Sequence, residues 1–307
     1  MSRIAVTGAT GLIGSAVVSA LAQRGDTVVV LSRNPELATE RLGADVEAFG
    51  WSDPAHGSPP SDALSGADAV VHLLGEPISQ RWSEQVKRRI RESRLLATRN
   101  LVAEIEGLPL AKRPGVLVSQ SATGYYGPRG EEELDETAAP GHGFLASVVK
   151  EWEAEARVAE RASLRVAVTR TGVVLTARGG ALPKMLPPFK AGVGGPVAGG
   201  RQYLPWVHLD DVVGAILFAV DNDSARGPLN VTAPAPVTNK VFSKALGHVL
   251  RRPAVLPVPG LAVKLLFGEM AEIVLTGQRA VPRRLQELDY KFRQPDLEPA
   301  LADALRN

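Results

Sequence analysis

Cysteine is absent from the 307 residues of this chain. That absence excludes disulfides, thiolate nucleophiles and cysteine metal ligands, so burial of apolar side chains must stabilise the fold. Long hydrophobic runs are lacking too, because each run is shorter than the roughly 18 residues that a membrane span needs. A strand expected from about Arg3 leaves no room for a secretory signal peptide. We therefore expect a soluble, cytoplasmic protein.

A charge excess of one sign is also missing, since 35 basic and 33 acidic residues leave a net charge of +2. Such a small field favours neither nucleic acid nor a membrane as partner. The most basic stretch, residues 81–94, combines an apolar stripe with Glu–Arg pairs at i, i+4 spacing, which is typical of the solvated face of a docked helix. The five histidines are scattered without ligand spacing, so we expect no metal site.

Short β-branched runs alternate with helical patterns through the first 170 residues. The expected strands are 3–7, 27–32, 46–49, 68–74, 115–119 and 164–170, and the expected helices are 11–24, 35–42, 81–106 and a helix from 143. Strands that are apolar on both faces and separated by helices predict a parallel sheet covered on both sides. The chain is therefore predicted to be an α/β protein with a Rossmann-like, doubly wound sheet, whose ligands lie beyond the carboxyl ends of the strands.

After residue 170 the regular alternation of strands and helices ends, and a smaller subdomain on the substrate side is expected. Residues 179–200 are rich in glycine and proline and are interpreted as a loop-dominated excursion. A helix at 209–220, a strand at 228–231 and a helix capped by Thr238 follow. We expect residues 1–178 to form the nucleotide-binding domain, with 206–232 returning to it, and 179–205 with 233–307 to form the small subdomain.

The strongest local motif is VTGATGLIGSAV, which places Gly8, Gly11 and Gly14 between a strand and a helix. A phosphate-binding turn needs glycine where the backbone approaches a pyrophosphate, and a helix N-terminus aimed at the anion. The motif predicts dinucleotide binding; a purely structural tight turn is the alternative. The residues expected to contact the cofactor here are Gly8, Thr10, Gly11, Leu12 and Ile13.

The second strand ends in Ser32 and Arg33 rather than in an acidic residue. An Asp or Glu would repel a 2′-phosphate, whereas a hydroxyl and a guanidinium can bind one. Hydrogen bonds to charged groups contribute roughly 1.5 to 3 kcal/mol, so we expect NADP(H) to be preferred over NAD(H) by about tenfold to a hundredfold. The alternative is that Arg33 points into water.

Further cofactor contacts are expected where the third and fourth strands end. Trp51 follows the third strand, and Leu74, Gly75, Glu76 and Arg81 follow the fourth. Glu76 and Arg81 are placed to orient ribose hydroxyls or the substrate, and a surface ion pair is the alternative of equal weight.

Several segments together resemble the extended short-chain dehydrogenase/reductases. TGATGLIG opens the chain, HLDDV opens a late helix, and the segments HLLGEPI, SQSATGYYG, FLASVVKEWE and RTGVVL resemble the atypical epimerase-family branch. The C-terminal segment resembles a small domain of unknown function. The resemblance implies an NADP-binding Rossmann domain with a short substrate-side lid, and it implies no known reaction.

In that superfamily a tyrosine, a lysine four residues later and a serine or threonine after the fifth strand carry the chemistry. Here Lys150 has Ala146 in the tyrosine position, and a register set by Glu153 instead puts Leu145 and Val149 in the two positions, so neither alignment supplies the tyrosine. The resemblance implies that Lys150 binds the nicotinamide ribose; an exposed surface lysine is the alternative. Ser121, or else Thr123, is the candidate hydroxyl, and Tyr126, or else its neighbour Tyr125, is the candidate proton donor unless it only packs.

We expect an NADP(H)-binding oxidoreductase or nucleotide-sugar-epimerase-like enzyme that lacks the usual tyrosine. Its carbonyl or hydroxyl substrate is not identified by the sequence, and a sugar nucleotide and a smaller carbonyl compound are both open. The substrate is expected between the carboxyl edge of the sheet and 179–205, where Arg178, Lys184, Lys190 and Arg201 are placed to meet an anionic group. The alternative is a protein that senses NADP(H) without turnover. The oligomeric state and the direction of hydride transfer stay open.

Overall fold

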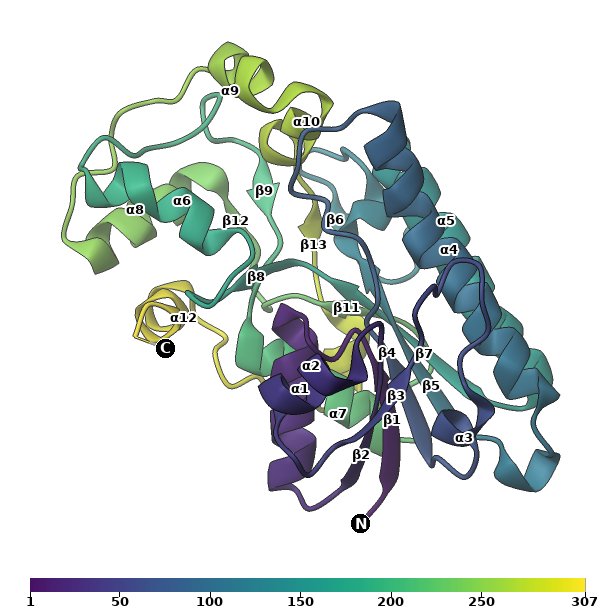
Figure 1. The fold of residues 1–307 in the computed structure, drawn as a ribbon. Helices are drawn as coiled ribbons and strands as arrows, with labels where there is room; N and C mark the ends of the chain where they lie inside the picture. The colour runs from purple at the N-terminus through teal and green to yellow at the C-terminus, as the bar shows by residue number, and fades with distance from the viewer. Residues whose placement is uncertain (307) are drawn as a thin grey trace.

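The computed structural model describes residues 1–306, and in that range seven parallel strands form one central sheet in the order β11-β7-β5-β4-β1-β2-β3 (Figure 1). Its strands are β1 (Arg3–Thr7), β2 (Thr27–Ser32), β3 (Glu47–Gly50), β4 (Ala69–His72), β5 (Val116–Ala122), β7 (Arg165–Thr171) and β11 (Gly227–Val231). The chain reverses direction across the sheet between β1 and β4, which is the switch point of a doubly wound fold. The predicted fold class is confirmed.

Both faces of the sheet are buried because successive side chains of each strand point to opposite sides. In β1, Ile4 and Val6 pack in one core cluster and Ala5 packs in the other. The first cluster is covered by α1 (Leu12–Gln23), α2 (Pro35–Leu42), α7 (Leu209–Asp221) and α11 (Arg283–Glu287). The second is covered by α3 (Ser61–Leu64), α4 (Glu84–Gly107) and α5 (Phe144–Arg157).

A third core cluster belongs to a smaller subdomain beside the carboxyl edge of the sheet (Figure 1). It packs around Trp206 and Phe242 and gathers α6 (Leu182–Lys190), α8 (Asn239–Leu250) and α12 (Leu297–Ala304). Short strands pair in twos, namely β8 (Val173–Leu175) with β10 (Trp206–His208), β9 (Tyr203–Leu204) with β12 (Val237–Thr238), and β6 (Glu133–Leu134) with β13 (Arg279–Ala280). Single 3-10 turns occupy Leu110–Lys112, Thr123–Tyr126, Val158–Ala162 and Gly268–Met270.

The segment 179–200, expected to be mostly loop, contains the helix α6. Pro183 lies in its first turn, where a missing N–H is tolerated, but Pro187 and Pro188 lie inside it. The helix persists because Leu182, Leu186 and Phe189 bury one face at i, i+4 and i+7. Helix propensity was a poor guide here because tertiary burial outweighs it.

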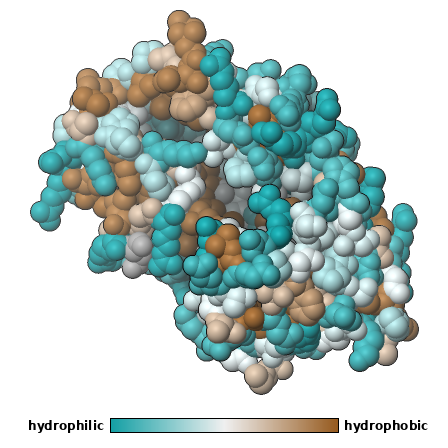
Figure 2. Space-filling view, in the orientation of Figure 1, coloured by the Kyte–Doolittle hydropathy of each residue, from teal (hydrophilic) through white to brown (hydrophobic). Residues whose placement is uncertain are grey.

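The C-terminal stretch divides between the two parts of the molecule. Leu285 of α11 packs in the core of the main sheet, and the hydroxyl of Tyr290 lies 3.1 Å from the carbonyl of Asp211 on α7. By contrast, α9 (Gly260–Phe267) lies over the subdomain and exposes Leu261 and Leu265, and Figure 2 shows apolar surface in this part of the molecule. The next helix, α10 (Ala271–Leu275), packs through Ile273 with Trp82 and Ile90. Across residues 1–306, no helix has the length and apolar character that a membrane span requires.

Candidate functional site

The glycine turn between β1 and α1 leaves no room for side chains. Gly8 has φ +66°, and a Cβ on it would lie 2.7 Å from the carbonyl oxygen of Leu73. A Cβ on Gly14 would lie 2.2 Å from the carbonyl oxygen of Gly8. Gly11 caps α1 without a side-chain bond to the first-turn amides, so these donors stay available to an anion.

Ser32 and Arg33 lie at the carboxyl end of β2, next to the glycine turn in the sheet. The Ser32 hydroxyl donates to the carbonyl of Asn34 at 3.0 Å and accepts from its amide at 3.2 Å, which shapes the turn into α2. The Arg33 side chain is exposed, and no carboxylate occupies this strand end among the described residues. This arrangement suits a phosphate rather than a free pair of ribose hydroxyls.

Trp51 requires a correction, because its side chain faces the core and not the cofactor cleft. The indole is 3% exposed, packs in the second core cluster and donates to the carbonyl of Gly57 at 2.8 Å. Its amide donates to the carbonyl of Ser32 at 2.8 Å. Trp51 therefore anchors the end of β3 beside Ser32 and offers no side-chain contact to a dinucleotide.

The turn after β4 brings Leu74, Gly75 and Glu76 to the carboxyl edge of the sheet. The amide of Glu76 donates to the hydroxyl of Ser93 at 2.9 Å, and its carboxylate pairs with Arg89 at 4.0 Å. Arg81, by contrast, is exposed and approaches Gly268 in the C-terminal half. The Glu76–Arg81 pair weighed from the sequence is not formed.

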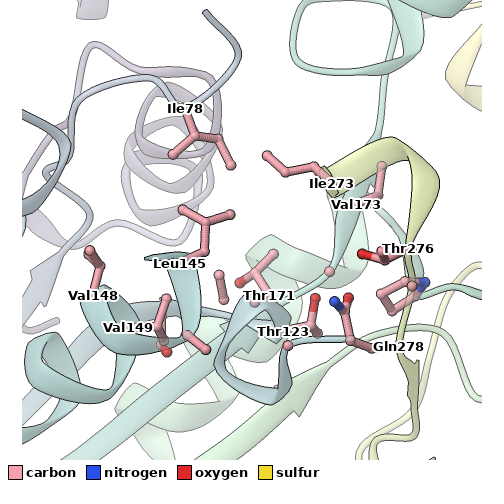
Figure 3. Close-up of a pocket in the computed structure, with 18 of the residues that line it drawn as sticks. Ile78, Thr123, Leu145, Val148, Val149, Thr171, Val173, Ile273, Thr276 and Gln278 are labelled. Carbon is pink, nitrogen blue, oxygen red and sulfur yellow. The ribbon is translucent and has the colours of Figure 1, made fainter. Parts of the chain in front are cut away.

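A cavity of about 290 Å³ opens between this edge and the subdomain (Figure 3). Its walls come from the ends of β5 and β7, the first half of α5, the loop after β4, and the C-terminal segments that include Tyr203, Glu272 and Gln278. Ile13, from the glycine turn, reaches it as well. The cavity is therefore continuous with the expected path of a dinucleotide.

On α5, the side facing the cavity is apolar. Leu145, Ala146 and Val149 line it, whereas Lys150 is exposed and is not among the described residues of the wall. The wall positions of α5 that lie four residues apart are 145 with 149 and 148 with 152, whereas 146 has no such partner because 150 points away from the wall. The expected contact of Lys150 with the nicotinamide ribose is therefore not supported by its position.

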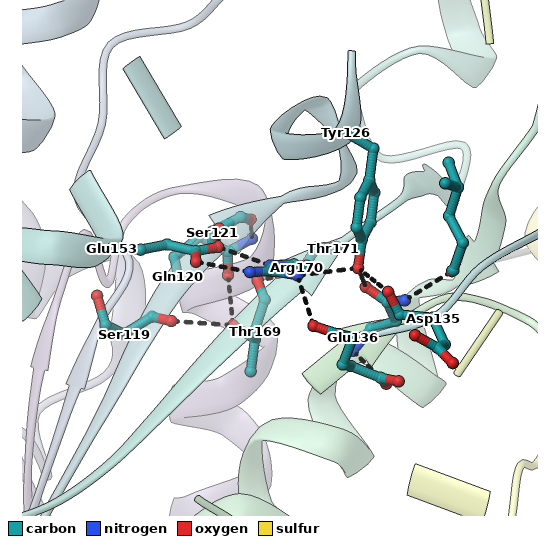
Figure 4. A network of polar contacts seen from close by, with 12 residues as sticks. Ser119, Gln120, Ser121, Tyr126, Asp135, Glu136, Glu153, Thr169, Arg170 and Thr171 are labelled. Atoms are coloured by element: carbon teal, nitrogen blue, oxygen red, sulfur yellow. Dashed lines mark hydrogen bonds and ion pairs between the residues drawn. The ribbon is translucent and has the colours of Figure 1, made fainter. Parts of the chain in front are cut away.

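Ser121 lies beside the cavity and belongs to a buried polar network (Figure 4). Its hydroxyl donates to Glu153 Oε1 at 2.6 Å, and Arg170 binds both carboxylate oxygens of Glu153, at 2.8 and 2.9 Å. Although burial opposes charge, the bonds to Glu153 raise the pKa of Arg170. The ion pair holds the end of β5 to α5 and β7.

Tyr126, the candidate proton donor from the sequence, does not face the cavity, and that prediction is corrected here. Its hydroxyl lies 2.7 Å from Asn230 Oδ1 and 2.9 Å from the carbonyl of Asp135, and it accepts from Arg170 at 3.0 Å (Figure 4). The side chain has no exposed surface, and burial raises its pKa to about 12. Neither Tyr126 nor Tyr125 is among the described residues that line the cavity. Tyr126 is thus a structural residue in this fold.

Arg94 is a cavity residue that the sequence interpretation missed. It donates through Nη1 to the carbonyls of Glu76 and Ile90, both at 3.0 Å, and its guanidinium lies 5.2 Å over the ring of Trp152. Burial lowers its pKa to about 10. The sequence contained a sign of this position. Arg94 follows Ile90 by four residues, so it lies on the apolar stripe of α4 and interrupts it.

Behind the cavity, His72 joins a buried chain of hydrogen bonds. Its Nδ1 lies 2.7 Å from the hydroxyl of Thr7, and its Nε2 lies 2.9 Å from Thr98 Oγ1, which also accepts from Trp152. The hydroxyl of Thr98 donates its own hydrogen to the carbonyl of Arg94 at 2.6 Å. Nε2 of His72 therefore carries the proton, and burial lowers the pKa of His72 to about 4.

The expected lid touches both sides of the cleft. A Cβ on Gly179 or on Gly180 would lie 3.3 Å from the side chain of Leu12, and Lys184 Nζ donates to the hydroxyl and carbonyl of Ser79 at 2.7 and 3.1 Å. The segment 179–184 thus spans from the glycine turn to the loop after β4. Lys184 is held by neutral oxygens here rather than by an anion.

One group of side chains in the described range has ligand-like spacing, namely His208, Asp210 and Asp303. His208 is the N-cap of α7 and accepts from the amide of Asp210 at 3.2 Å. This bond gives the histidine a structural role at the start of the helix.

The doubly wound parallel sheet, the glycine turn and the cavity at the carboxyl edge define a protein of the short-chain dehydrogenase/reductase fold. The family model described as the NAD dependent epimerase/dehydratase family matches residues 4–232, and a domain of unknown function, DUF1731, matches residues 258–304. The chain belongs to this epimerase/dehydratase family, which confirms the resemblance.

Named relatives match along nearly the whole chain. The Arabidopsis thaliana protein "Epimerase family protein SDR39U1 homolog, chloroplastic" is 41% identical over 97% of this chain and 85% of its own. The Mus musculus protein "Epimerase family protein SDR39U1" is 38% identical over 99% of each. The crystal structure of human epimerase family protein SDR39U1 (isoform2) with NADPH is 34% identical, covers 99% of both chains and has a TM-score of 0.88.

Proposed function

We propose that this protein is an NADP(H)-dependent oxidoreductase that acts on a carbonyl compound or its alcohol. The observation that carries the proposal is the cavity, which joins the glycine turn through Ile13 to the polar end of β5 at Ser121 and Thr123. The exposed Arg33 at the end of β2, and the NADPH in the structure of the human relative, support NADP(H) as the cofactor.

Bound NADPH would supply a hydride to the substrate, and the protein's part is to position the substrate oxygen. Ser121 borders the cavity with 1% of its surface exposed and commits its hydrogen to Glu153, so a lone pair of its oxygen is what remains to accept a hydrogen bond from a substrate hydroxyl. The Arg170–Glu153 pair holds this orientation without entering the cavity. Thr123, on the same strand end, provides a hydroxyl that can donate to a carbonyl.

The proton donor in this proposal is Tyr203, which lines the cavity from the subdomain side. It takes the place of the tyrosine that the superfamily has on this helix, since Leu145 and Val149 of α5 face the cavity here. The guanidinium of Arg279 lies over the face of the Tyr203 ring, 5.6 Å from its centre, and also pairs with Glu133 at 3.4 Å.

Oxidation of NADPH in the presence of a panel of aldehydes and ketones tests the proposal. Ser121→Ala and Tyr203→Phe are expected to lower kcat by about a hundredfold, the usual contribution of a positioned acid or base. Tyr125→Phe is the matched control: it removes a phenol outside the cavity, keeps the ring that packs on Arg170, and leaves kcat within twofold of wild type. A loss in Tyr125→Phe equal to that in Tyr203→Phe contradicts the assignment.

The apolar pair Leu145 and Val149 favours a second candidate, an NADP(H)-sensing protein without turnover. In that case the cavity takes a regulatory ligand and the hydride stays on the cofactor. Tight NADPH binding, with no oxidation on any carbonyl of the panel, supports this candidate over the oxidoreductase.

A further inference from the structure

The chemistry of the cavity walls narrows the class of substrate. One side is built from large apolar side chains that come from three separate elements, and Figure 3 shows several of them converging on the same space: Ile78, Trp82, Leu145, Val148, Val149 and Ile273. Removing apolar ligand surface from water against such a wall is favourable in proportion to the area buried. A ligand that places hydrocarbon here is therefore bound more tightly than one that places phosphates here.

The opposite side of the cavity is polar but uncharged. Thr123, Thr171, Thr276 and Gln278 gather there, beyond the ends of β5 and β7 (Figure 3). Hydroxyl and amide groups suit a single carbonyl or hydroxyl oxygen, which can both donate and accept. The cavity therefore has one apolar side and one neutral hydrogen-bonding side.

The charged residues of the cavity do not suit a diphosphate. Apart from His142, the described residues of the wall include one cation, Arg94, and one carboxylate, Glu272, so their charges cancel. Arg94 already donates to two backbone carbonyls. A nucleoside diphosphate brings two phosphates, which proteins usually meet with several cations or with a free helix N-terminus.

The volume points in the same direction. At about 290 Å³ the cavity lies at the lower end of the range for small-molecule sites, roughly 300 to 1,000 Å³. Part of this space adjoins Ile13 of the glycine turn and Val174 after β7, where the reactive end of a dinucleotide is expected. A compact ligand fills the remainder.

We propose that the substrate is a compact, neutral, largely apolar carbonyl compound or its alcohol, and not a nucleotide sugar. This inference rests on the proposed function for the placement of the cofactor, and it commits the same site to one chemical class. The hydrocarbon part lies against Leu145, Val149 and Ile273, and the oxygen lies toward Thr123 and Ser121.

Calorimetric titration of the NADPH-loaded protein tests this class without requiring turnover. The probes are 1-butanol, 1-pentanol and 1-hexanol, which cannot accept a hydride, and UDP-glucose. Each added methylene is expected to tighten binding by about fourfold, the gain for burying one methylene group. UDP-glucose is expected to bind at least tenfold more weakly than 1-hexanol. Tighter binding of UDP-glucose, or no dependence on chain length, overturns the proposal.

A pair of variants locates the site. Ile273→Asn, in the apolar wall, is expected to weaken 1-hexanol binding by about tenfold, whereas Leu265→Asn, on the exposed face of α9, leaves it unchanged. Equal effects of the two changes contradict the placement. If alkanols bind but no aldehyde is reduced by NADPH, the proposed ligand class stands and the proposed oxidoreductase function is contradicted. If a nucleotide sugar is turned over, the oxidoreductase function stands and the proposed ligand class is contradicted.

Discussion

Leu145 and Val149 lie one helical turn apart on α5 and both face the cavity. They occupy the spacing at which the superfamily has its tyrosine and lysine, and they present hydrocarbon to the substrate instead of a phenol and an ammonium. The proton chemistry must therefore come from other elements, and the cavity gains an apolar wall. This relationship connects the missing catalytic pair with the proposed class of substrate.

The exposure of Lys150 predicts that it contributes little to cofactor binding. Lys150→Ala is expected to leave the dissociation constant of NADPH within about twofold of wild type, since exposed single charges contribute about 0 to 1 kcal/mol. Fluorescence titration with NADPH measures it. A loss of tenfold or more places the ammonium against the ribose after all and contradicts the orientation of α5.

Arg33 is expected to set the preference between the two dinucleotides. Arg33→Ala should weaken NADPH binding by about tenfold to a hundredfold and leave NADH binding nearly unchanged, because only NADPH carries the 2′-phosphate. Arg41→Ala, an exposed arginine in the last turn of α2, is the matched control. If both cofactors weaken equally, or if the control has the same effect, Arg33 is not the selecting residue.

Gly14 is expected to be irreplaceable, because a Cβ there would lie 2.2 Å from the carbonyl oxygen of Gly8. Gly14→Ala should displace the turn, weaken NADPH binding by more than tenfold and lower Tm. Gly107→Ala, in the last turn of α4, where a Cβ meets no atom within 4 Å, should do neither. Wild-type NADPH affinity in Gly14→Ala would show that the turn does not hold the pyrophosphate.

His72 predicts a pH dependence of stability. Its pKa is lowered to about 4 from an ordinary value of 6.5. The unfolded chain therefore binds this proton more readily, and stability falls as pH drops from about 6.5 toward about 4. The loss between pH 7 and pH 5 should be about 2 kcal/mol.

Urea unfolding of wild type and His72→Gln at these two pH values measures the effect. His72→Gln is expected to be less stable than wild type at both pH values. Its free energy of unfolding should fall by about 2 kcal/mol less than that of wild type between pH 7 and pH 5. His248→Gln, an exposed histidine beside Glu298, should keep the wild-type dependence. An unchanged dependence in His72→Gln would show that the buried imidazole is not the group that titrates.

The sequence was sufficient for the sheet and the glycine turn, because strand alternation and the GxxGxxG spacing are local signals. It was insufficient for α5, where periodicity located the apolar stripe but not which flank meets the cavity; that depends on how β5 and the subdomain pack against the helix. Tyr126 and Trp51 were misplaced for a related reason, since strand ends carry both core and cleft residues. Arg94 interrupts the apolar stripe of α4, but the sequence interpretation assigned it, with the neighbouring charged residues, to the solvated face of the helix.

The cavity walls from Tyr203, Glu272 and Gln278 could not be located from the sequence at all. These residues reach the site only because β9 and the end of α10 fold back over the carboxyl edge of the sheet. No local pattern encodes such an approach between segments more than 80 residues apart from β5.

Transfer of deuterium to hexanal from [4,4-²H₂]NADPH, which is labelled on both faces of the nicotinamide, tests the central claim most directly. The account predicts that wild-type protein produces 1-hexanol with one deuterium at C1, detected by mass spectrometry, and that Ser121→Ala and Tyr203→Phe each slow this transfer by about a hundredfold. Undeuterated hexanal at the end of the incubation, with NADPH bound and unoxidised and with the same result for ketones of similar size, would contradict it.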